Sequence, residues 1–417
     1  MKIAYIVSRY PAVSHTFILR EVLGLRAAGF DVTTISVRRA DPTHLLTPHD
    51  QQEAAQTHVL VGASALSYLG ACLHALTRPL HLARMFARAW SLRRPGLKGS
   101  LWACFYALEA ILAWHICHQR GINHFHAHFA NVACDVALLA ALLAGPDASF
   151  TFTMHGPTEF ADVAHFRLAE KAAAAASIIC ISDFARSQLM ALLPPAQWPK
   201  LRIVHCGIDV TAYRFQSRTP AAVREILCVG RLVPVKAQAL LLEALATLSI
   251  PFHLTLVGDG PDRARLESLT DQLGLRPHVT FAGNIGQNAI HTYYQRAHLF
   301  VLPSFAEGLP VVLIEAMASG VPVISTRIAG IPELIEHNVE GLLVPPGRVD
   351  CLRDAIQQLL RDETRSIAFA HAARAKVESA FDGRQCTHDL AAIFSAMQTH
   401  PTPTLETPDA VVATGAT

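Results

Sequence analysis

Short apolar runs rich in β-branched residues alternate with longer Ala- and Leu-rich stretches along almost the whole chain. The runs are nearly continuous, which is typical of strands buried on both faces of a parallel sheet. The longer stretches have the composition of the helices that connect parallel strands. We predict strands at 2–7, 31–37, 122–128, 149–154, 177–181, 201–205, 226–229, 252–257, 278–282, 299–302 and 321–325.

This alternation restarts once. Residues 210–224 are polar and turn-prone, and a new strand, loop and helix open at Ile226. We therefore predict an α/β protein with two Rossmann-like, doubly wound domains that face a central cleft. The predicted parts are an N-terminal domain (1–215), a C-terminal domain (216–385), a helix that packs back on the N-terminal domain (386–398) and a disordered Pro/Thr-rich tail (399–417).

Composition narrows the class of protein. The 417 residues are 51% hydrophobic and 16% charged, which is enough apolar material for two full cores. A net charge of +2 gives no reason to expect a nucleic-acid partner. No apolar run approaches the roughly 18–20 residues needed to span a bilayer, so we expect no membrane-spanning helix. The first residues favour a buried strand over a signal peptide. Nine scattered cysteines without a CxxC pair indicate reduced thiols in a cytoplasmic protein.

One stretch departs from this neutral average. Residues 54–108 contain six Arg and Lys residues and no Asp or Glu, and Phe86 and Trp90 lie one helical turn apart beside Arg84 and Arg88. A basic amphipathic helix of this kind can bind an anionic membrane surface, at roughly 1 kcal/mol per basic residue. We interpret 78–98 as a peripheral contact with the inner face of the cytoplasmic membrane; the alternative is a solvated basic face.

The strongest chemical pattern lies between Ser304 and Gly320. Pro310 suits the first turn of a helix and Gly320 its end, so Glu307 falls in the loop and Glu315 inside the helix. A lone carboxylate in an apolar helix needs a partner. That partner is either the diol of a ribose or a structural Arg or Lys, and the spacing does not choose between them.

Two further patterns follow predicted strands. Arg231 and Lys236 lie just beyond a strand, where open α/β sheets bind ligands, and two cations there suit a diphosphate. The alternative is a pair of surface cations. His155 ends an apolar strand ahead of Gly156, which favours the ligand-binding edge of the sheet over a core position.

Three histidines, His124, His126 and His128, share one face of a predicted strand. No Cys or carboxylate follows at a ligand spacing, so a metal site is disfavoured against acceptor contact or packing. The loop after the first strand lacks GxGxxG, which argues against a hydride-transfer enzyme.

Together these motifs resemble the large retaining glycosyltransferase family with the GT-B fold, often called family 4. The resemblance rests on Glu307 and Glu315 at E-x7-E spacing, on Arg231 with Lys236, and on the segments 204–209 and 257–261. The opening segment 10–21, together with 155–160, resembles the branch that builds bacterial exopolysaccharides, the colanic-acid type included. Ala237 stands where the family frequently has glycine, and we expect this to alter the start of the helix little.

The resemblance implies retaining, metal-independent transfer of a sugar from a UDP- or GDP-sugar to a glycan or lipid-linked oligosaccharide, with no cofactor. It implies a place in bacterial exopolysaccharide or cell-surface polysaccharide biosynthesis. Two alternatives are a GT-B nucleotide-sugar epimerase and a non-catalytic carbohydrate-binding protein. The implied roles are catalysis for His155 and Glu307; donor binding for Arg231, Lys236, Gly308, Leu309, Glu315, Gly283, Asn284 and Ile285; and acceptor contact for His15, Glu21, His126 and His128.

Overall fold

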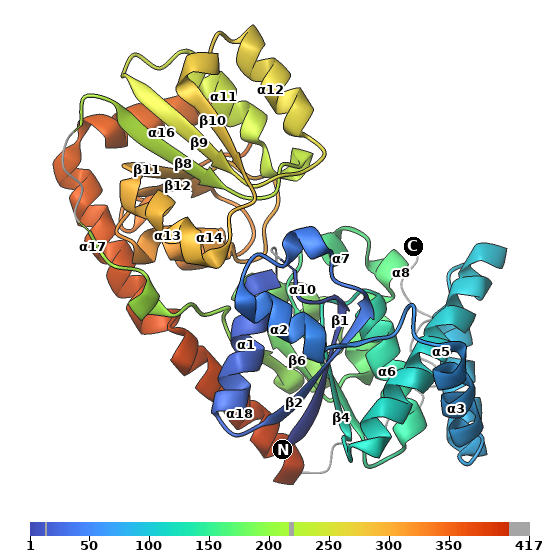
Figure 1. The fold of residues 1–417 in the computed structure, drawn as a ribbon. Coiled ribbons are helices and arrows are strands. Elements are labelled where there is room, and N and C mark those ends of the chain that lie inside the picture. Colours follow the sequence, from blue (N-terminus) through green and yellow to red (C-terminus); the bar gives the residue numbers. More distant parts are fainter. Residues whose placement is uncertain (13–14, 217–220, 400–417) are drawn as a thin grey trace, which may run out of the picture.

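The computed structural model describes residues 1–12, 15–216 and 221–399, and it folds into two α/β domains (Figure 1). Each domain is built around one parallel sheet. The predicted two-domain α/β architecture is confirmed. The predicted disordered tail lies outside the described residues, apart from Thr399, which ends the last helix.

The N-terminal sheet has seven strands in the order β3-β2-β1-β4-β5-β6-β7, and every pairing is parallel. Alternate residues of the first strand face opposite cores: Ala4 and Ile6 on one side, Ile3 and Tyr5 on the other. This burial of both faces explains the continuous apolar runs. The strands are β1 (Lys2–Arg9), β2 (Asp31–Arg38), β3 (His58–Val59), β4 (His124–His128), β5 (Ser149–Met154), β6 (Ser177–Cys180) and β7 (Leu201–Ile203).

The C-terminal sheet has six parallel strands in the order β10-β9-β8-β11-β12-β13. Its strands also divide their side chains between two cores, Leu227 facing one and Ile226 the other. The strands are β8 (Arg224–Val229), β9 (Phe252–Val257), β10 (Val279–Gly283), β11 (Leu299–Leu302), β12 (Val323–Thr326) and β13 (Gly341–Val344).

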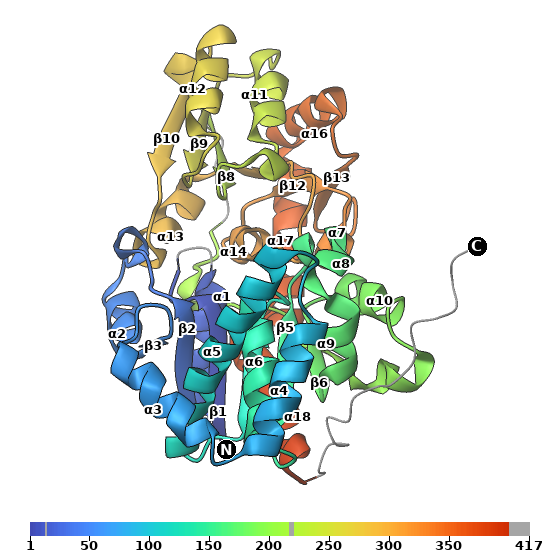
Figure 2. The same ribbon diagram turned by 90° about the vertical axis from the view of Figure 1, so that its right-hand side faces the viewer.

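Helices cover both faces of each sheet (Figures 1 and 2). Those of the N-terminal domain are α1 (Thr16–Ala27), α2 (Pro48–Gln56), α3 (Ala65–Ala75), α4 (Pro79–Ser91), α5 (Leu97–Gln119), α6 (Val132–Ala144), α7 (Thr158–Ala161), α8 (Val163–Phe166), α9 (Leu168–Ala174) and α10 (Asp183–Met190). Those that follow are α11 (Gln238–Ala246), α12 (Arg263–Gln272), α13 (Gln287–Arg296), α14 (Val311–Ala318), α15 (Ile331–Leu334), α16 (Val349–Arg361), α17 (Glu363–Ala380) and α18 (Gly383–Thr399).

Every predicted strand is present, with ends shifted by up to two residues, but two strands escaped prediction. β3 is a two-residue edge strand, too short for any periodicity. β13 begins with Gly341 and has a single β-branched residue, so its four residues lack the strand composition. Both missed strands lie at sheet edges.

The end of the described chain returns to the N-terminal domain. Helix α18 runs beside that domain after α17 leaves the C-terminal one (Figure 1), and Leu390 and Phe394 are buried in the same core as Ile3 and Tyr5. Where the chain crosses back, the backbones of Ile208 and Gly383 pair, and a Cβ on Gly207 would lie 2.5 Å from Gly383 Cα. The absence of side chains therefore allows the two crossing segments to touch.

Helix α5 corrects the expectation that no helix could cross a membrane. By length and composition alone its 23 residues suffice, although half of its most apolar window is buried inside the protein. The buried half includes Ala110, Ala113 and Trp114, which pack in the core together with α6 residues. Its hydropathy therefore has a packing explanation.

Buried histidines make the stability of this fold depend on pH. Burial lowers the pKa of His124 from 6.5 to about 3, and its ring nitrogens meet the hydroxyls of Ser149 and Thr151. Below pH 6.5 this histidine binds a proton in the unfolded chain but stays neutral in the folded chain. The free energy of unfolding therefore decreases as the pH is lowered. We expect a loss of about 1.4 kcal/mol from this residue between pH 7.5 and 5.5.

Urea unfolding of His124→Gln over this pH range should show a shallower pH dependence than the original protein. His388→Gln, on the exposed side of α18, serves as the control variant. An equally steep dependence in His124→Gln would contradict the assignment.

Candidate functional site

The carboxyl ends of strands from both domains meet at one place, where Gly308 touches His155. Gly308 lies between β11 and α14, and His155 directly follows β5. A Cβ on Gly308 would lie 2.0 Å from the His155 carbonyl oxygen, so only glycine permits this approach. The predicted ligand-binding edges of the two sheets are therefore in contact.

Glu307 and Lys236 form an ion pair beside this contact. Lys236 Nζ lies 2.6 Å from Glu307 Oε1, and the Ser304 hydroxyl donates to the same oxygen at 2.6 Å. Glu307 is buried, whereas Lys236 is partly exposed. The arrangement holds a cation next to the carboxylate at the rim of the domain junction.

Glu315 pairs with an arginine from the other domain. Arg20, on α1, donates to Glu315 Oε1 at 2.8 Å and to the Gln287 side chain at 2.5 Å. Tyr294 donates its hydroxyl to Glu315 Oε2 at 2.9 Å, and burial raises the pKa of Tyr294 well above its usual value. Of the two alternatives for the partner of Glu315, this conformation shows the structural arginine. Both oxygens of Glu315 are engaged.

Aromatic and imidazole side chains surround His155 on the N-terminal side. His128 Nδ1 lies 3.0 Å from His155 Nε2, and the Phe17 and Phe129 ring centres lie 4.7 and 4.5 Å from that of His155. Burial, reinforced by His128, lowers the pKa of His155 well below its usual value, and burial lowers the pKa of His15 to about 4. His155 is therefore uncharged at neutral pH.

Glu21 extends this cluster. Its carboxylate accepts a 2.6 Å hydrogen bond from the Tyr5 hydroxyl and lies 3.2 Å from His128 Nε2. His15 joins through Phe129, whose ring centre lies 5.2 Å from that of His15. Three of the four predicted acceptor-side residues, His15, Glu21 and His128, thus gather near His155.

The acceptor-side prediction for His126 needs correction. His126 is completely buried within β4, and its two ring nitrogens meet Thr151 and Thr153 hydroxyls at 2.9 and 3.0 Å. Only the end of a strand reaches the sheet edge, so His128 lies at the junction and His126 does not. Across the described ranges, Glu21, His126 and His128 are the acids and histidines close enough to share a metal, but the threonines already occupy His126.

The loop after β8 is shaped by close backbone packing. Gly258 has φ +128°, and a Cβ there would lie 2.2 Å from the Gly230 carbonyl oxygen. Arg231 is exposed on this loop. Ala237 adopts φ +53°, a left-handed conformation that costs a non-glycine residue roughly 1–2 kcal/mol, and α11 begins directly after it at Gln238.

Two predicted donor-binding segments lie beside these residues. Gly283, with φ +71°, ends β10, and Asn284 and Ile285 lead into α13, which carries Gln287 and Tyr294. Leu309 is buried in a C-terminal core, so its side chain packs there. Helix α14 begins after Pro310, and Gly320 follows its end with φ +73°, as predicted.

Arg20, Gln287, Tyr294 and Ser304 were missed by sequence reasoning. Arg20 was visible as a cation on the helix after the first strand, but nothing local indicated that it reaches across to Glu315. Glu333 is a similar case: its carboxylate accepts from the backbone N–H groups of Asp183 and Phe184, at 2.7 and 2.8 Å, and so caps α10 across the domain junction.

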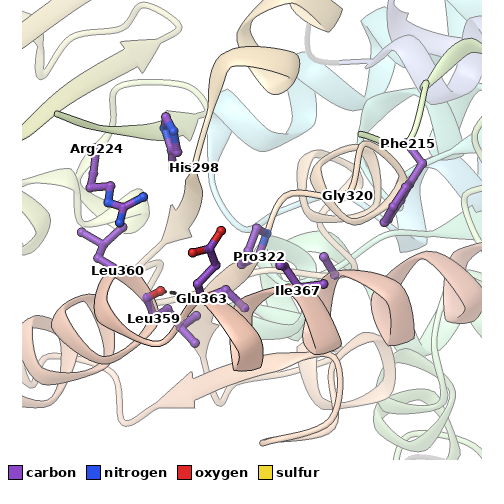
Figure 3. Close-up of a pocket in the computed structure, with 11 residues that line it drawn as sticks. Phe215, Arg224, His298, Gly320, Pro322, Leu359, Leu360, Glu363 and Ile367 are labelled. Carbon is purple, nitrogen blue, oxygen red and sulfur yellow. Dashed lines mark hydrogen bonds between the residues drawn. The ribbon is translucent and has the colours of Figure 1, made fainter. Parts of the chain in front are cut away.

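A small cavity in the C-terminal domain is separate from this site. It measures about 40 Å³ and lies between α16–α17 and the residues that open β8 and precede β11 and β12 (Figure 3). Figure 3 shows Arg224, His298 and Pro322 lining it. These lie at the amino ends of the strands, opposite the edge that carries Gly230 and Ser304.

The sequence and the fold are similar to those of known glycosyltransferases. Residues 209–376 match the family model described as "Glycosyl transferases group 1". The chain is 28% identical to amylovoran biosynthesis glycosyltransferase AmsK of Erwinia amylovora and 27% identical to putative colanic acid biosynthesis glycosyltransferase WcaL of Escherichia coli K12, in each case over 95% of this chain and 100% of the relative. Anabaena HepE, solved with UDP and glucose, superposes with a TM-score of 0.73 at 20% identity, covering 95% of this chain and 100% of that one. The fold is thus that of GT-B enzymes.

The Arg20–Glu315 pair should control how closely the domains associate. Arg20→Met leaves a buried carboxylate without its cation, which is costly unless the domains separate and admit water. We expect a larger radius of gyration in small-angle X-ray scattering. Arg26→Met, on the same helix but paired with Glu53 inside the N-terminal domain, is the control. Equal radii for the two variants would count against this role of Arg20.

Proposed function

We propose that the protein is a retaining glycosyltransferase of family 4 that transfers a sugar from a UDP- or GDP-sugar to a glycan or lipid-linked acceptor in bacterial exopolysaccharide biosynthesis. The observation that carries this proposal is the Lys236–Glu307 pair beside the Gly308–His155 contact, with Glu315 on α14, the helix that follows this loop. The match of 209–376 to group 1 glycosyl transferases and the full-length similarity to AmsK and WcaL support it.

In the proposed donor complex, Arg231 and Lys236 bind the diphosphate and Glu315 binds the ribose hydroxyls. Two cations can balance the diphosphate charge, which supports a metal-independent reaction. Glu315 must first exchange Arg20 for the ribose, while the Tyr294 hydroxyl can keep its hydrogen bond. Backbone groups at 283–285 are placed to meet the base, and the solved complexes of HepE with UDP and UDP-glucose support a nucleotide donor.

The chemistry follows from where charge develops. The bond between the anomeric carbon and the diphosphate oxygen breaks, the acceptor oxygen bonds to the same face of that carbon, and the departing phosphate oxygen takes the acceptor's proton. Lys236 and Arg231 stabilise the growing charge on the diphosphate. Glu307 positions Lys236 and contacts the transferred sugar, and neutral His155 can hydrogen-bond the sugar without repelling its positive character.

The aromatic and imidazole side chains around His155 form the proposed acceptor side. His15, His128 and Glu21 lie on the N-terminal domain next to His155, opposite the donor residues. A sugar hydroxyl bound there would face the anomeric carbon across the domain junction. The nucleotide-sugar epimerase and the non-catalytic binding protein are less well supported, because the relatives that match over the full length are named as glycosyltransferases.

Peripheral contact of 78–98 with an anionic membrane, at the cytoplasmic face, is also part of the proposal. Phe86 and Trp90 are exposed on α4, and Leu97, with 93% of its surface exposed, is on α5. Arg84 and Lys98 are exposed beside them, whereas Arg88 donates to the Glu170 carbonyl and so leaves the predicted basic stripe. Apolar side chains flanked by cations suit the boundary between headgroups and acyl chains.

Removing the donor contacts should lower turnover without unfolding the protein. Glu315→Gln loses the charged bonds to ribose, and we expect kcat/KM to fall about ten- to hundredfold, mainly through the donor KM. Lys236→Met should lower kcat about 10²- to 10³-fold. Lys376→Met, on α17, is the control. Sugar transfer from radiolabelled nucleotide sugars measures both effects, and near-normal transfer by either variant would refute its role.

Membrane contact should depend on salt and on the exposed aromatic side chains. We expect the protein to sediment with phosphatidylglycerol-containing vesicles, less so as ionic strength rises. The double change Phe86→Ser and Trp90→Ser should weaken binding at least tenfold. Trp198→Ser, at an exposed tryptophan elsewhere in the domain, is the matched control. Salt-independent sedimentation, or equal binding by all variants, would contradict this part of the proposal.

A further inference from the structure

A row of polar side chains crosses the N-terminal domain and ends at His155. It begins at Tyr5 on β1, passes through Glu21 on α1 and His128 at the end of β4, and reaches His155 directly after β5. We call these four residues the polar row. The strands β1, β4 and β5 are neighbours in the sheet, and Tyr5 and His128 have no exposed surface. Because water is kept away, the protonation of each group in the row depends on its neighbour.

The carboxylate of Glu21 sets the direction of the row. The Tyr5 hydroxyl donates to Glu21 Oε1 at 2.6 Å, and burial, reinforced by Glu21, raises the pKa of Tyr5 well above its usual value. His128 Nε2 lies 3.2 Å from the same oxygen. An unprotonated Nε2 would direct its lone pair at a carboxylate oxygen, which can only accept. His128 therefore carries a proton on Nε2.

The proton on His128 determines the tautomer of His155. A second proton would make His128 a cation without exposed surface, which is costly, so its Nδ1 is an acceptor. His155 Nε2 lies 3.0 Å from that Nδ1 and must be the donor. His155 is itself uncharged, because burial lowers its pKa well below the usual value. Its single ring proton is therefore on Nε2, and its Nδ1 keeps a lone pair.

The Nδ1 atom of His155 is directed towards the domain junction. Cys206 Sγ lies 3.9 Å from it, and Cys206 packs on a core of the C-terminal domain. Burial raises the pKa of Cys206 well above its usual value, so the thiol is protonated, and a thiol is a weak donor. Nδ1 can therefore accept a stronger hydrogen bond from a hydroxyl group at the junction.

The contacts of His128 are less suited to direct binding of an acceptor. Its side chain has no exposed surface, and its two ring nitrogens face Glu21 and His155. The Glu21 side chain is 20% exposed, but its Oε1 already receives the Tyr5 hydroxyl. An acceptor hydroxyl could bond to His128 only by breaking the polar row.

We propose that Glu21 and His128 are positioning residues that keep the proton of His155 on Nε2, so that His155 Nδ1 accepts a hydrogen bond from a hydroxyl of the transferred sugar. The inference rests on the proposed function, and it changes the role of Glu21 and His128 from acceptor contact to action through His155. Without the carboxylate, the ring proton of His155 can occupy either nitrogen, and only one of these forms accepts the hydroxyl.

The first test separates kcat from KM in sugar transfer. Glu21→Gln has the same size, but its amide N–H groups favour the opposite tautomer of His128. We expect kcat to fall about ten- to hundredfold, while the donor and acceptor KM change less than about threefold. Glu53→Gln is the matched control, because Glu53 also accepts from a buried tyrosine hydroxyl, that of Tyr10, but lies outside the polar row. Its kcat should stay within about twofold of the original.

Two changes at His128 test whether its nitrogen atoms matter or only its volume. His128→Phe keeps a ring among the surrounding aromatic side chains but removes both nitrogens, and we expect the same loss of kcat as in Glu21→Gln. His128→Asn places a side-chain oxygen where it can accept from His155 Nε2. It should recover at least about fivefold of the kcat lost in His128→Phe. Equal kcat in the two variants would contradict the inference.

The second test observes the tautomer directly and needs no turnover. In protein labelled with ¹⁵N in histidine, the NMR signals of His155, assigned by their loss in His155→Gln, should show an unprotonated Nδ1. In Glu21→Gln we expect Nδ1 to become partly protonated. Failure of the original protein to transfer sugar would refute the proposed function, whereas this spectrum tests the polar row independently.

Three further results would overturn the inference. The first is an acceptor KM raised at least tenfold in Glu21→Gln with unchanged kcat, which would make Glu21 an acceptor contact. The second is a loss of kcat in Glu53→Gln as large as in Glu21→Gln, which would indicate a general effect on the fold. The third is a protonated Nδ1 of His155 in the original protein.

Discussion

Glu315 is buried in an apolar helix, and its need for partners determines how the two domains meet. Arg20 supplies the missing charge from the other domain, and Tyr294 supplies a hydrogen bond from its own. A carboxylate in such surroundings is stable only while something donates to it. Arg20 satisfies Oε1 and Tyr294 satisfies Oε2, so Glu315 joins the two domains with both of its oxygens engaged.

The remaining junction is built from backbone contacts. Gly308 lets two loops touch where any side chain would separate them, and Glu333 caps α10 across the gap. Helix α18 adds an apolar anchor on the far side of the N-terminal sheet. Arg20 and Glu333 make charged contacts across the junction, so small changes in charge can alter the relation of the two domains.

The N-terminal domain divides its chemistry between two faces. Near His155, burial lowers the pKa of His155 and of His15, so both rings are uncharged at neutral pH. On α3–α5 the arginines and exposed apolar side chains suit an amphiphile. The end of β4 and the loop after it contact both regions: the Ala130 carbonyl accepts from Lys171, and His128 contacts His155.

The order of residues along the chain was sufficient for much of the fold, because burial on both faces imposes continuous apolar runs on central strands. It also predicted that Glu307, Lys236 and His155 lie at the same edge, since each follows a strand and parallel strands place their carboxyl ends at one edge. It could not identify the partners of Glu315 or distinguish His126 from His128. Arg20 and Glu315 are 295 positions apart in the sequence, and His128 differs from His126 because β4 ends there. Only tertiary packing decides both points.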